Sequence, residues 1–67
     1  MKLLVNGNDL TVNSSVNSIQ QLIEHLELRN KSLIVEHNQQ ILKKEDHEKT
    51  IINDGDRIEI VHFVGGG

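Results

Sequence analysis

Apolar and polar residues alternate at the start of the chain, and the alternation is interrupted by a polar segment. Four apolar residues occupy every second position on either side of that segment: Leu3, Val5, Leu10 and Val12. Asn6 and Gly7 lie between the two runs, and an Asn-Gly pair there favours a tight hairpin because both residues accept a positive φ. The pattern therefore predicts two antiparallel strands, at residues 2–6 and 9–13.

A different spacing follows the hairpin. Apolar residues now recur at intervals of three and four positions: Val16, Ile19, Leu22, Ile23 and Leu26. This spacing places them on one face of a helix, which we predict at residues 17–27. Ser15, Asn17 or Ser18 would cap it, because a short side-chain oxygen accepts a hydrogen bond from an unpaired N–H of the first turn.

The second half of the chain predicts three more short strands. The apolar, β-branched run at residues 33–35 is typical of a buried strand, and residues 40–42 form a shorter one. Residues 43–49 are polar without an apolar period, which indicates a loop or a single helical turn. The Asn-Asp-Gly-Asp sequence at residues 53–56 predicts a turn, and the last strand runs from residue 57 to about residue 63.

The order of elements is a hairpin, a helix and three further strands. The helix must cover one face of the sheet to bury its apolar stripe. We therefore predict an α+β fold of the β-grasp (ubiquitin-like) type, a mixed sheet of four to five strands with one main helix and the last strand beside the first in the centre. The strand order rests on analogy with that fold. Residues 1–64 would form the domain, and residues 65–67 a flexible glycine tail.

Composition narrows the class of protein. The chain has 67 residues, no cysteine and a net charge of −3, and Phe63 is its one aromatic residue. Nucleic-acid binding would need a basic stripe and stacking aromatics, and no apolar run is long enough to span a membrane. The start of the chain lacks the long apolar region of a signal peptide, so we expect a cytoplasmic protein. A chain this short has a thin core, which favours a module that acts with partners and is a monomer when free.

The last three residues are the candidate chemical site. Gly65, Gly66 and Gly67 follow the last predicted strand directly. Without side chains, such a tail fits a narrow channel and presents the α-carboxylate of Gly67 to another protein's active site. The alternative is a loose chain end without function. Side-chain chemistry offers less, because the sequence contains no catalytic triad or phosphate loop, and its four histidines lack the spacing of metal ligands.

Over its whole length the chain resembles the ThiS family of thiamine-biosynthesis sulfur carriers. The stretches that carry the resemblance are residues 5–7, Val16 with Leu22 and Ile23, residues 36–38 with Ile41, residues 54–60, and the ending at residues 60–67. The glycine ending is the most specific of these, although Gly65 adds a third glycine where many carriers have another residue.

The resemblance implies a chemistry and a set of partners. In this family a ThiF-like adenylyltransferase consumes ATP to activate the terminal carboxylate, which becomes a thiocarboxylate after a sulfur donor protein supplies sulfur. A ThiG-like thiazole synthase then receives the sulfur. By position, Gly67 is the adenylated and thiolated residue, while Gly65 and Gly66 form the arm. The chain would bind no cofactor or metal and would act as a co-substrate, not as an enzyme.

A docking surface is expected next to the tail. Val61 and Phe63 alternate with Ile58 and Ile60, so they lie on the opposite face of the last strand. If Ile58 and Ile60 face the helix, the other two lie on the open face of the sheet. The expected partner-binding residues are Leu4, Glu59, Val61, His62, Phe63 and Val64. The alternative is that scattered exposed apolar residues need no function.

Acidic residues precede the tail. We expect Asp54, Asp56 and Glu59 near its base, where they would complement a basic rim on an activating enzyme. Asp flanking a glycine also suits a tight turn, and this simpler explanation is preferred for Asp54.

Three other functions remain open from the residues, the last of them from a different class. The small subunit of molybdopterin synthase resembles this chain in fold and tail, but such subunits have a proline before the final glycines, which residues 61–64 lack. A protein-conjugating modifier would form an amide with a lysine. A non-catalytic ubiquitin-like interaction domain would never have its carboxylate activated.

Overall fold

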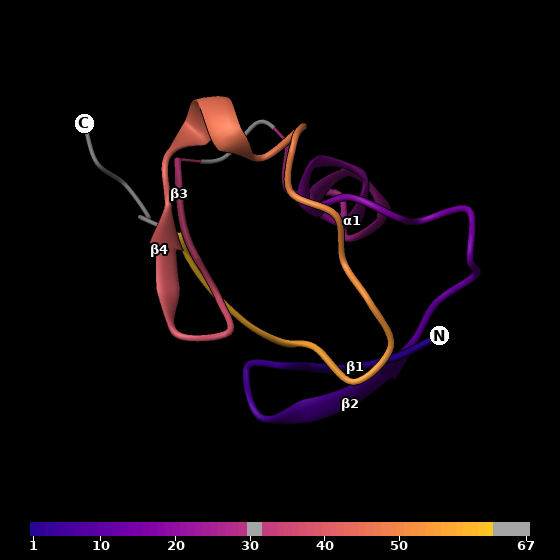
Figure 1. Cartoon of the computed structure of the whole chain (residues 1–67). Helices are drawn as coiled ribbons and strands as arrows, with labels where there is room; N and C mark the ends of the chain where they lie inside the picture. Colours follow the sequence, from indigo (N-terminus) through magenta and orange to yellow (C-terminus); the bar gives the residue numbers. More distant parts are fainter. Residues whose placement is uncertain (30–31, 63–67) are drawn as a thin grey trace.

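The structure is a computed structural model that describes residues 1–29 and 32–62. Within these residues, five strands form one sheet that curves around a single α-helix (Figure 1). The elements are β1 (Lys2–Val5), β2 (Asn8–Thr11), α1 (Ile19–His25), β3 (Leu33–His37), β4 (Gln40–Leu42), the 3₁₀ turn η1 (Lys44–Asp46) and β5 (Arg57–His62). The predicted α+β architecture is confirmed. None of the helices described is long and apolar enough to cross a bilayer.

The last strand lies in the centre of the sheet. The strand order is β2-β1-β5-β3-β4. β5 runs parallel to β1, with Val5 opposite Ile58, and antiparallel to β3, with Val35 opposite Ile60. The prediction that the last strand lies beside the first is confirmed. The strand that leads toward the glycines is therefore supported on both sides.

Both hairpins close with two residues of positive φ. Asn6 has φ 51° and Gly7 has φ 80°, as the Asn-Gly prediction requires. In the second hairpin, Asn38 has φ 49° and Gln39 has φ 74°. Backbone angles of this sign match the twist of the flanking strands. The second turn thus adopts the same kind of geometry without a glycine.

The first turn of α1 is completed by the loop that precedes β5. Ser18, with φ −134°, caps the helix through its Oγ, which accepts from the N–H of Gln21 at 3.2 Å. Ile19 N–H donates to the carbonyl of Thr50 at 3.0 Å, and Gln20 N–H to that of His47 at 2.9 Å. These bonds satisfy N–H groups that a helix start leaves unpaired.

The helix is shorter than predicted because its expected first residues pair elsewhere. Asn17 accepts from Ile52 N–H at 3.0 Å, and Ser18 forms a bridge with Ile51. At the other end Glu27 takes a positive φ of 61°, and Leu28 N–H bonds back to the Ile23 carbonyl at 2.9 Å. A left-handed residue with this backward bond ends a helix.

The core lies between α1 and the sheet. Its buried apolar residues are Leu3, Val12, Ile19, Leu22, Ile23, Val35, Ile52, Ile58 and Ile60. The prediction of a buried strand at residues 33–35 is wrong for Ile34, which is 42% exposed. Successive strand residues face opposite sides, so Val35 enters the core while Ile34 lies on the open face.

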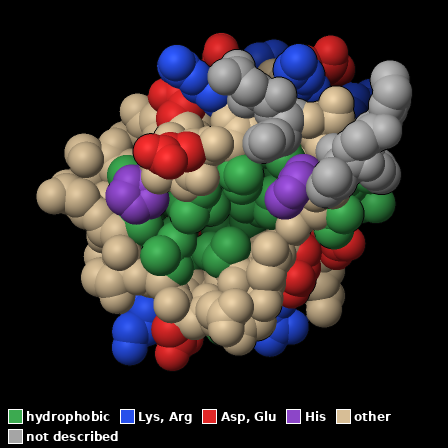
Figure 2. All heavy atoms as spheres, turned by 180° about the vertical axis from the view of Figure 1, so that it is seen from behind, with side chains coloured by type: hydrophobic (Ala, Val, Ile, Leu, Met, Phe, Trp, Pro, Cys, Tyr) green, Lys and Arg blue, Asp and Glu red, His purple; other side chains and the backbone are tan. Residues whose placement is uncertain are grey.

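The buried core is flanked by apolar residues that stay partly exposed. A second set of apolar residues packs against it while remaining partly exposed: Met1, Val5, Leu10, Val16, Leu26, Leu28, Leu33 and Leu42. Figure 2, seen from behind, shows hydrophobic side chains gathered in a hollow with a histidine on either side. Such partial covering is expected for a domain of this length.

Candidate functional site

The base of the predicted tail is the end of β5. Ile58 and Ile60 are buried and Val61 is 57% exposed, so the expected alternation along this strand is confirmed. His62, also exposed, is the last residue of β5 and pairs with Leu33. The predicted site residues Phe63, Val64, Gly65, Gly66 and Gly67 lie outside the described residues.

An apolar and acidic patch covers the open face beside Val61. In the pairing register, Ile34 lies opposite Val61, Glu36 opposite Glu59, and Ile41 opposite Glu36. We call these five residues the open-face patch. Its three aliphatic side chains are exposed by 42%, 72% and 57% for Ile34, Ile41 and Val61.

Sequence reasoning found Val61 and Glu59 but missed the three members of the patch on β3 and β4. Ile34, Glu36 and Ile41 become recognisable only when the pairing of β3 with β5 is known. The available signal was the alternation within β3, which places Ile34 and Glu36 on the same face.

Other predicted residues do not gather at the base of the tail. Leu4 pairs with Arg57, and Val61 lies four residues further along β5, about 13 Å away at the rise of a strand. Asp54 and Asp56 precede the start of β5, which is the end opposite the tail. The expectation that these two aspartates lie near the tail is wrong. Asp54 Oδ1 instead accepts from Lys2 N–H at 2.7 Å, which fits the turn role preferred for it.

Asp56 fastens the start of β5 to the β3–β4 turn. Its carboxylate accepts from His37 Nε2 at 2.7 Å, from Asn53 N–H at 2.8 Å and from Asn38 Nδ2 at 3.2 Å. Partial burial raises the pKa of Asp56, but the hydrogen bonds from His37, Asn53 and Asn38 outweigh it and leave the pKa below 3.8. The charged carboxylate is thus the favoured form, and its role is structural.

Asn6 supports the other end of β5. Its main-chain N–H donates to the Ile58 carbonyl at 2.9 Å. Its side-chain Oδ1 accepts from Ile60 N–H at 2.7 Å, and its Nδ2 donates to the Ile60 carbonyl at 3.1 Å. The sequence identified Asn6 only as a turn residue, because a bond across 54 positions leaves no local signal.

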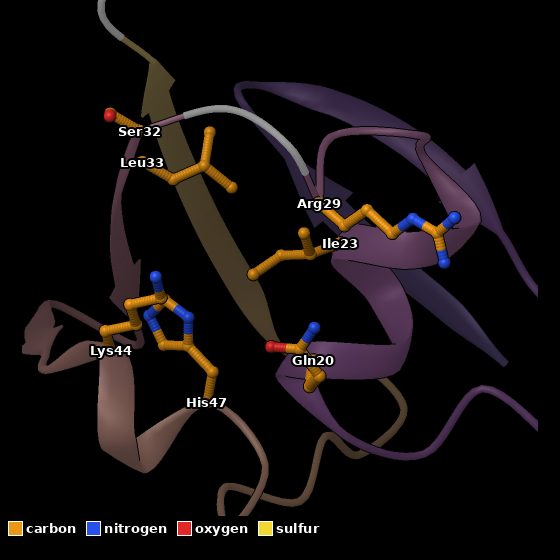
Figure 3. A pocket seen from close by; sticks show the side chains of 7 residues that line it. All are labelled: Gln20, Ile23, Arg29, Ser32, Leu33, Lys44 and His47. Atoms are coloured by element: carbon orange, nitrogen blue, oxygen red, sulfur yellow. The ribbon is translucent and has the colours of Figure 1, made fainter.

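A surface cavity of about 270 Å³ lies between α1, β3 and η1. In Figure 3, Ile23 and Leu33 point into it, whereas the guanidinium of Arg29 points away. His47, at its wall, is only 4% exposed, and its Nε2 has no hydrogen-bond partner among the residues described. Burial lowers the pKa of His47 below 6.5; Asp46 raises it and Lys44 lowers it further, with a net decrease. His47 is therefore neutral at neutral pH.

The fold and the similarity to known proteins together show which family this chain belongs to. A helix across one face of a mixed sheet, with the first and last strands parallel in the centre, is the β-grasp arrangement. The model of the ThiS family matches residues 3–67, so the chain belongs to the ThiS family. It is 45% identical to the sulfur carrier protein ThiS of Bacillus subtilis (strain 168) over 65 residues, which cover 97% of this chain and 98% of the relative.

Two further relatives are also connected with thiamine or thiazole synthesis by their names. A crystal structure of the thiamine biosynthesis protein ThiS from Geobacter metallireducens superposes with a TM-score of 0.83 and 33% identity, covering 100% of both chains. The thiazole synthase of Paramagnetospirillum magneticum (strain ATCC 700264 / AMB-1) is 36% identical over 67 residues. This match covers all of the present chain but 20% of that synthase. A ThiS-like segment therefore occurs within a protein named thiazole synthase.

Proposed function

We propose that the chain carries sulfur for the formation of the thiazole of thiamine, with the α-carboxylate of Gly67 as the carrying group. The observation that supports this most strongly is the family match, which extends through residue 67. The relative named as a sulfur carrier covers nearly the same length. Residues 1–64 would be the domain that partners recognise, and residues 65–67 the arm that enters their active sites.

The chemistry follows from the properties of a carboxylate. At neutral pH it is anionic and a poor electrophile, so one oxygen must become part of a leaving group. A ThiF-like adenylyltransferase would join that oxygen to the α-phosphorus of ATP and release pyrophosphate. Sulfide supplied by a donor protein would then attack the acyl carbon, form the C–S bond and expel AMP, which leaves a thiocarboxylate on Gly67.

In this scheme the chain is a co-substrate and not an enzyme. ATP is bound and consumed by the adenylyltransferase, and the carrier itself requires no cofactor. Because the exchange depends on ATP and on several enzymes visited in turn, we place it in the cytoplasm. A glycine arm suits it, since reacting atoms must approach to about 3–3.5 Å inside an enclosed site.

The second partner would be a ThiG-like thiazole synthase. The ThiS-like segment within the Paramagnetospirillum synthase supports this pairing, and it favours the thiazole pathway over a role in molybdopterin synthase. We assign docking to the open-face patch, because exposed aliphatic side chains bury area on contact and Glu36 and Glu59 complement a basic rim.

A truncation tests the proposed function in cells. In a strain that depends on this chain for thiamine, the intact chain should support growth without added thiamine. A chain lacking only Gly67 should not, because its new terminal carboxylate would end one residue short of the reacting groups. Normal growth of the strain with the truncated chain would contradict the proposal.

A further inference from the structure

The side chain of Asn6 continues the sheet where β1 ends. β1 pairs with β5 at Leu4 and Val5, after which the chain turns away. The next pairing groups on this side of β5 are the N–H and carbonyl of Ile60, and both are bonded to the Asn6 carboxamide, at 2.7 and 3.1 Å. A side-chain amide thus takes the place that a strand backbone would occupy.

The other side of β5 is supported for longer. β3 pairs with β5 up to Leu33, which lies opposite His62. On the β1 side, Asn6 makes the hydrogen bonds nearest to the tail among the residues described. The end of β5 is therefore held by a strand on one side and by a single side chain on the other.

We propose that Asn6 is a positioning residue that fixes where β5 ends and the reactive arm begins. With β5 held to His62, five residues separate the strand from the carboxylate of Gly67. Without the Asn6 side chain, the end of β5 frays, and more residues must be ordered when Gly67 enters a partner's active site. This inference rests on the proposed function, since it concerns delivery of that carboxylate.

Fraying at the end of β5 slows delivery of the carboxylate for an entropic reason. Each extra residue that must be ordered when the arm enters an active site costs the equivalent of about a tenfold loss in rate. Four members of the open-face patch lie on strand segments that stay paired, and only Val61 lies on the part of β5 that frays, so docking is largely preserved. The loss should therefore fall mainly on kcat for loading of the carrier, with a smaller change in KM.

The test needs variants that separate the side-chain bonds from the backbone angle. Asn6→Gly removes the carboxamide but tolerates the φ of 51°. Asn38→Gly is the matched control: its φ is 49°, and its Oδ1 accepts from Arg57 N–H at 2.9 Å, at the start of β5. Asn6→Asp keeps an acceptor for Ile60 N–H, but its second carboxylate oxygen replaces Nδ2 beside the Ile60 carbonyl, so one bond is lost and a repulsion is added.

Two measurements are compared below the unfolding temperature of every variant. The first is hydrogen exchange of the Ile60 amide. The second is the rate of thiocarboxylate formation, followed by intact mass with an adenylyltransferase, ATP and a sulfur source. Asn6→Gly should speed Ile60 exchange and lower kcat about tenfold. Asn38→Gly should load like the wild type, and Asn6→Asp should load more slowly than the wild type, because it cannot donate to the Ile60 carbonyl.

The outcomes separate this inference from the proposed function. If wild type and Asn6→Gly load at the same kcat, the positioning role is overturned while the carrier role stands. Equal losses in Asn6→Gly and Asn38→Gly would also overturn it, because they would report general destabilisation. If the wild-type chain itself is never loaded, the proposed function fails and the positioning role fails with it.

Discussion

Glu36 on β3 and Glu59 on β5 are cross-strand partners, so two carboxylates stand opposite each other on the open face of the sheet. Like charges placed directly opposite destabilise a sheet. The pair adjoins Ile34 and Val61, which are exposed aliphatic residues. An unfavourable charge pair beside exposed apolar surface fits a face that basic partners cover.

Reversing the charge of one member of the Glu36–Glu59 pair should have opposite effects on the stability of the fold and on partner binding. Glu36→Lys turns the repulsive pair into an attractive one, so the free energy of unfolding should rise by about 0.5 kcal/mol. The same change should weaken binding to the adenylyltransferase, chiefly through a slower association rate. Urea unfolding and stopped-flow association measure the two effects. Unchanged or faster association of the Glu36→Lys variant would contradict the assignment of this face to docking.

The apolar part of the patch has a matched control elsewhere on the surface. Val61→Asp and Ile51→Asp alter aliphatic residues of nearly equal exposure, 57% and 56%. Ile51 lies beside Ser18 at the start of α1, away from the open face. Titration with each partner enzyme should show at least about tenfold weaker binding for Val61→Asp and little change for Ile51→Asp. Equal losses for the two variants would argue against a specific docking face.

Asp56 should contribute to acid stability. Its folded pKa lies below 3.8, so its contribution is present above that pH and is lost as the pH falls through the lowered pKa. Asp56→Asn should cost about 1–2 kcal/mol at neutral pH, because Asn38, Asn53 and His37 lose a charged acceptor. Its unfolding temperature should also change less with pH in the acid range. Asp9→Asn, at an exposed position of β2, serves as the control and should behave like the wild type.

His47 should affect stability in a different pH range. Its folded pKa is lowered, so the unfolded chain takes up the proton more readily, and stability should fall as the pH drops below 6.5 toward the lowered pKa. His47→Leu removes this titration, and its unfolding temperature should vary less than that of the wild type between about pH 7.5 and 5. Parallel curves for the two proteins would show that His47 does not titrate on unfolding.

Turn residues and the spacing of apolar residues predicted most of the fold. Asn6 and Gly7 marked the first hairpin because few other residues accept two successive positive φ angles. The apolar stripe located α1, but its first residues were misplaced because Ser18 pairs with the loop at Ile51. That pairing joins segments far apart in sequence, and no local pattern reports it.

The candidate site was predicted less completely. Val61 was found from alternation along one strand, whereas Ile34 and Ile41 required the register between strands. Asp56 was assigned to the wrong end of β5 because closeness in sequence to the tail is not closeness in space: each strand residue adds about 3.3 Å. The Asn6–Ile60 bonds likewise depend on the tertiary fold.

The most direct test of the carrier role is the intact mass of the chain after incubation with ATP, a ThiF-like adenylyltransferase and a sulfur source. If the Gly67 carboxylate carries sulfur, the mass should increase by the replacement of one oxygen by one sulfur, located by fragmentation at Gly67 and absent when Gly67 is deleted. An unchanged mass, with an enzyme shown to be active on another carrier, would contradict the claim that the Gly67 carboxylate carries sulfur.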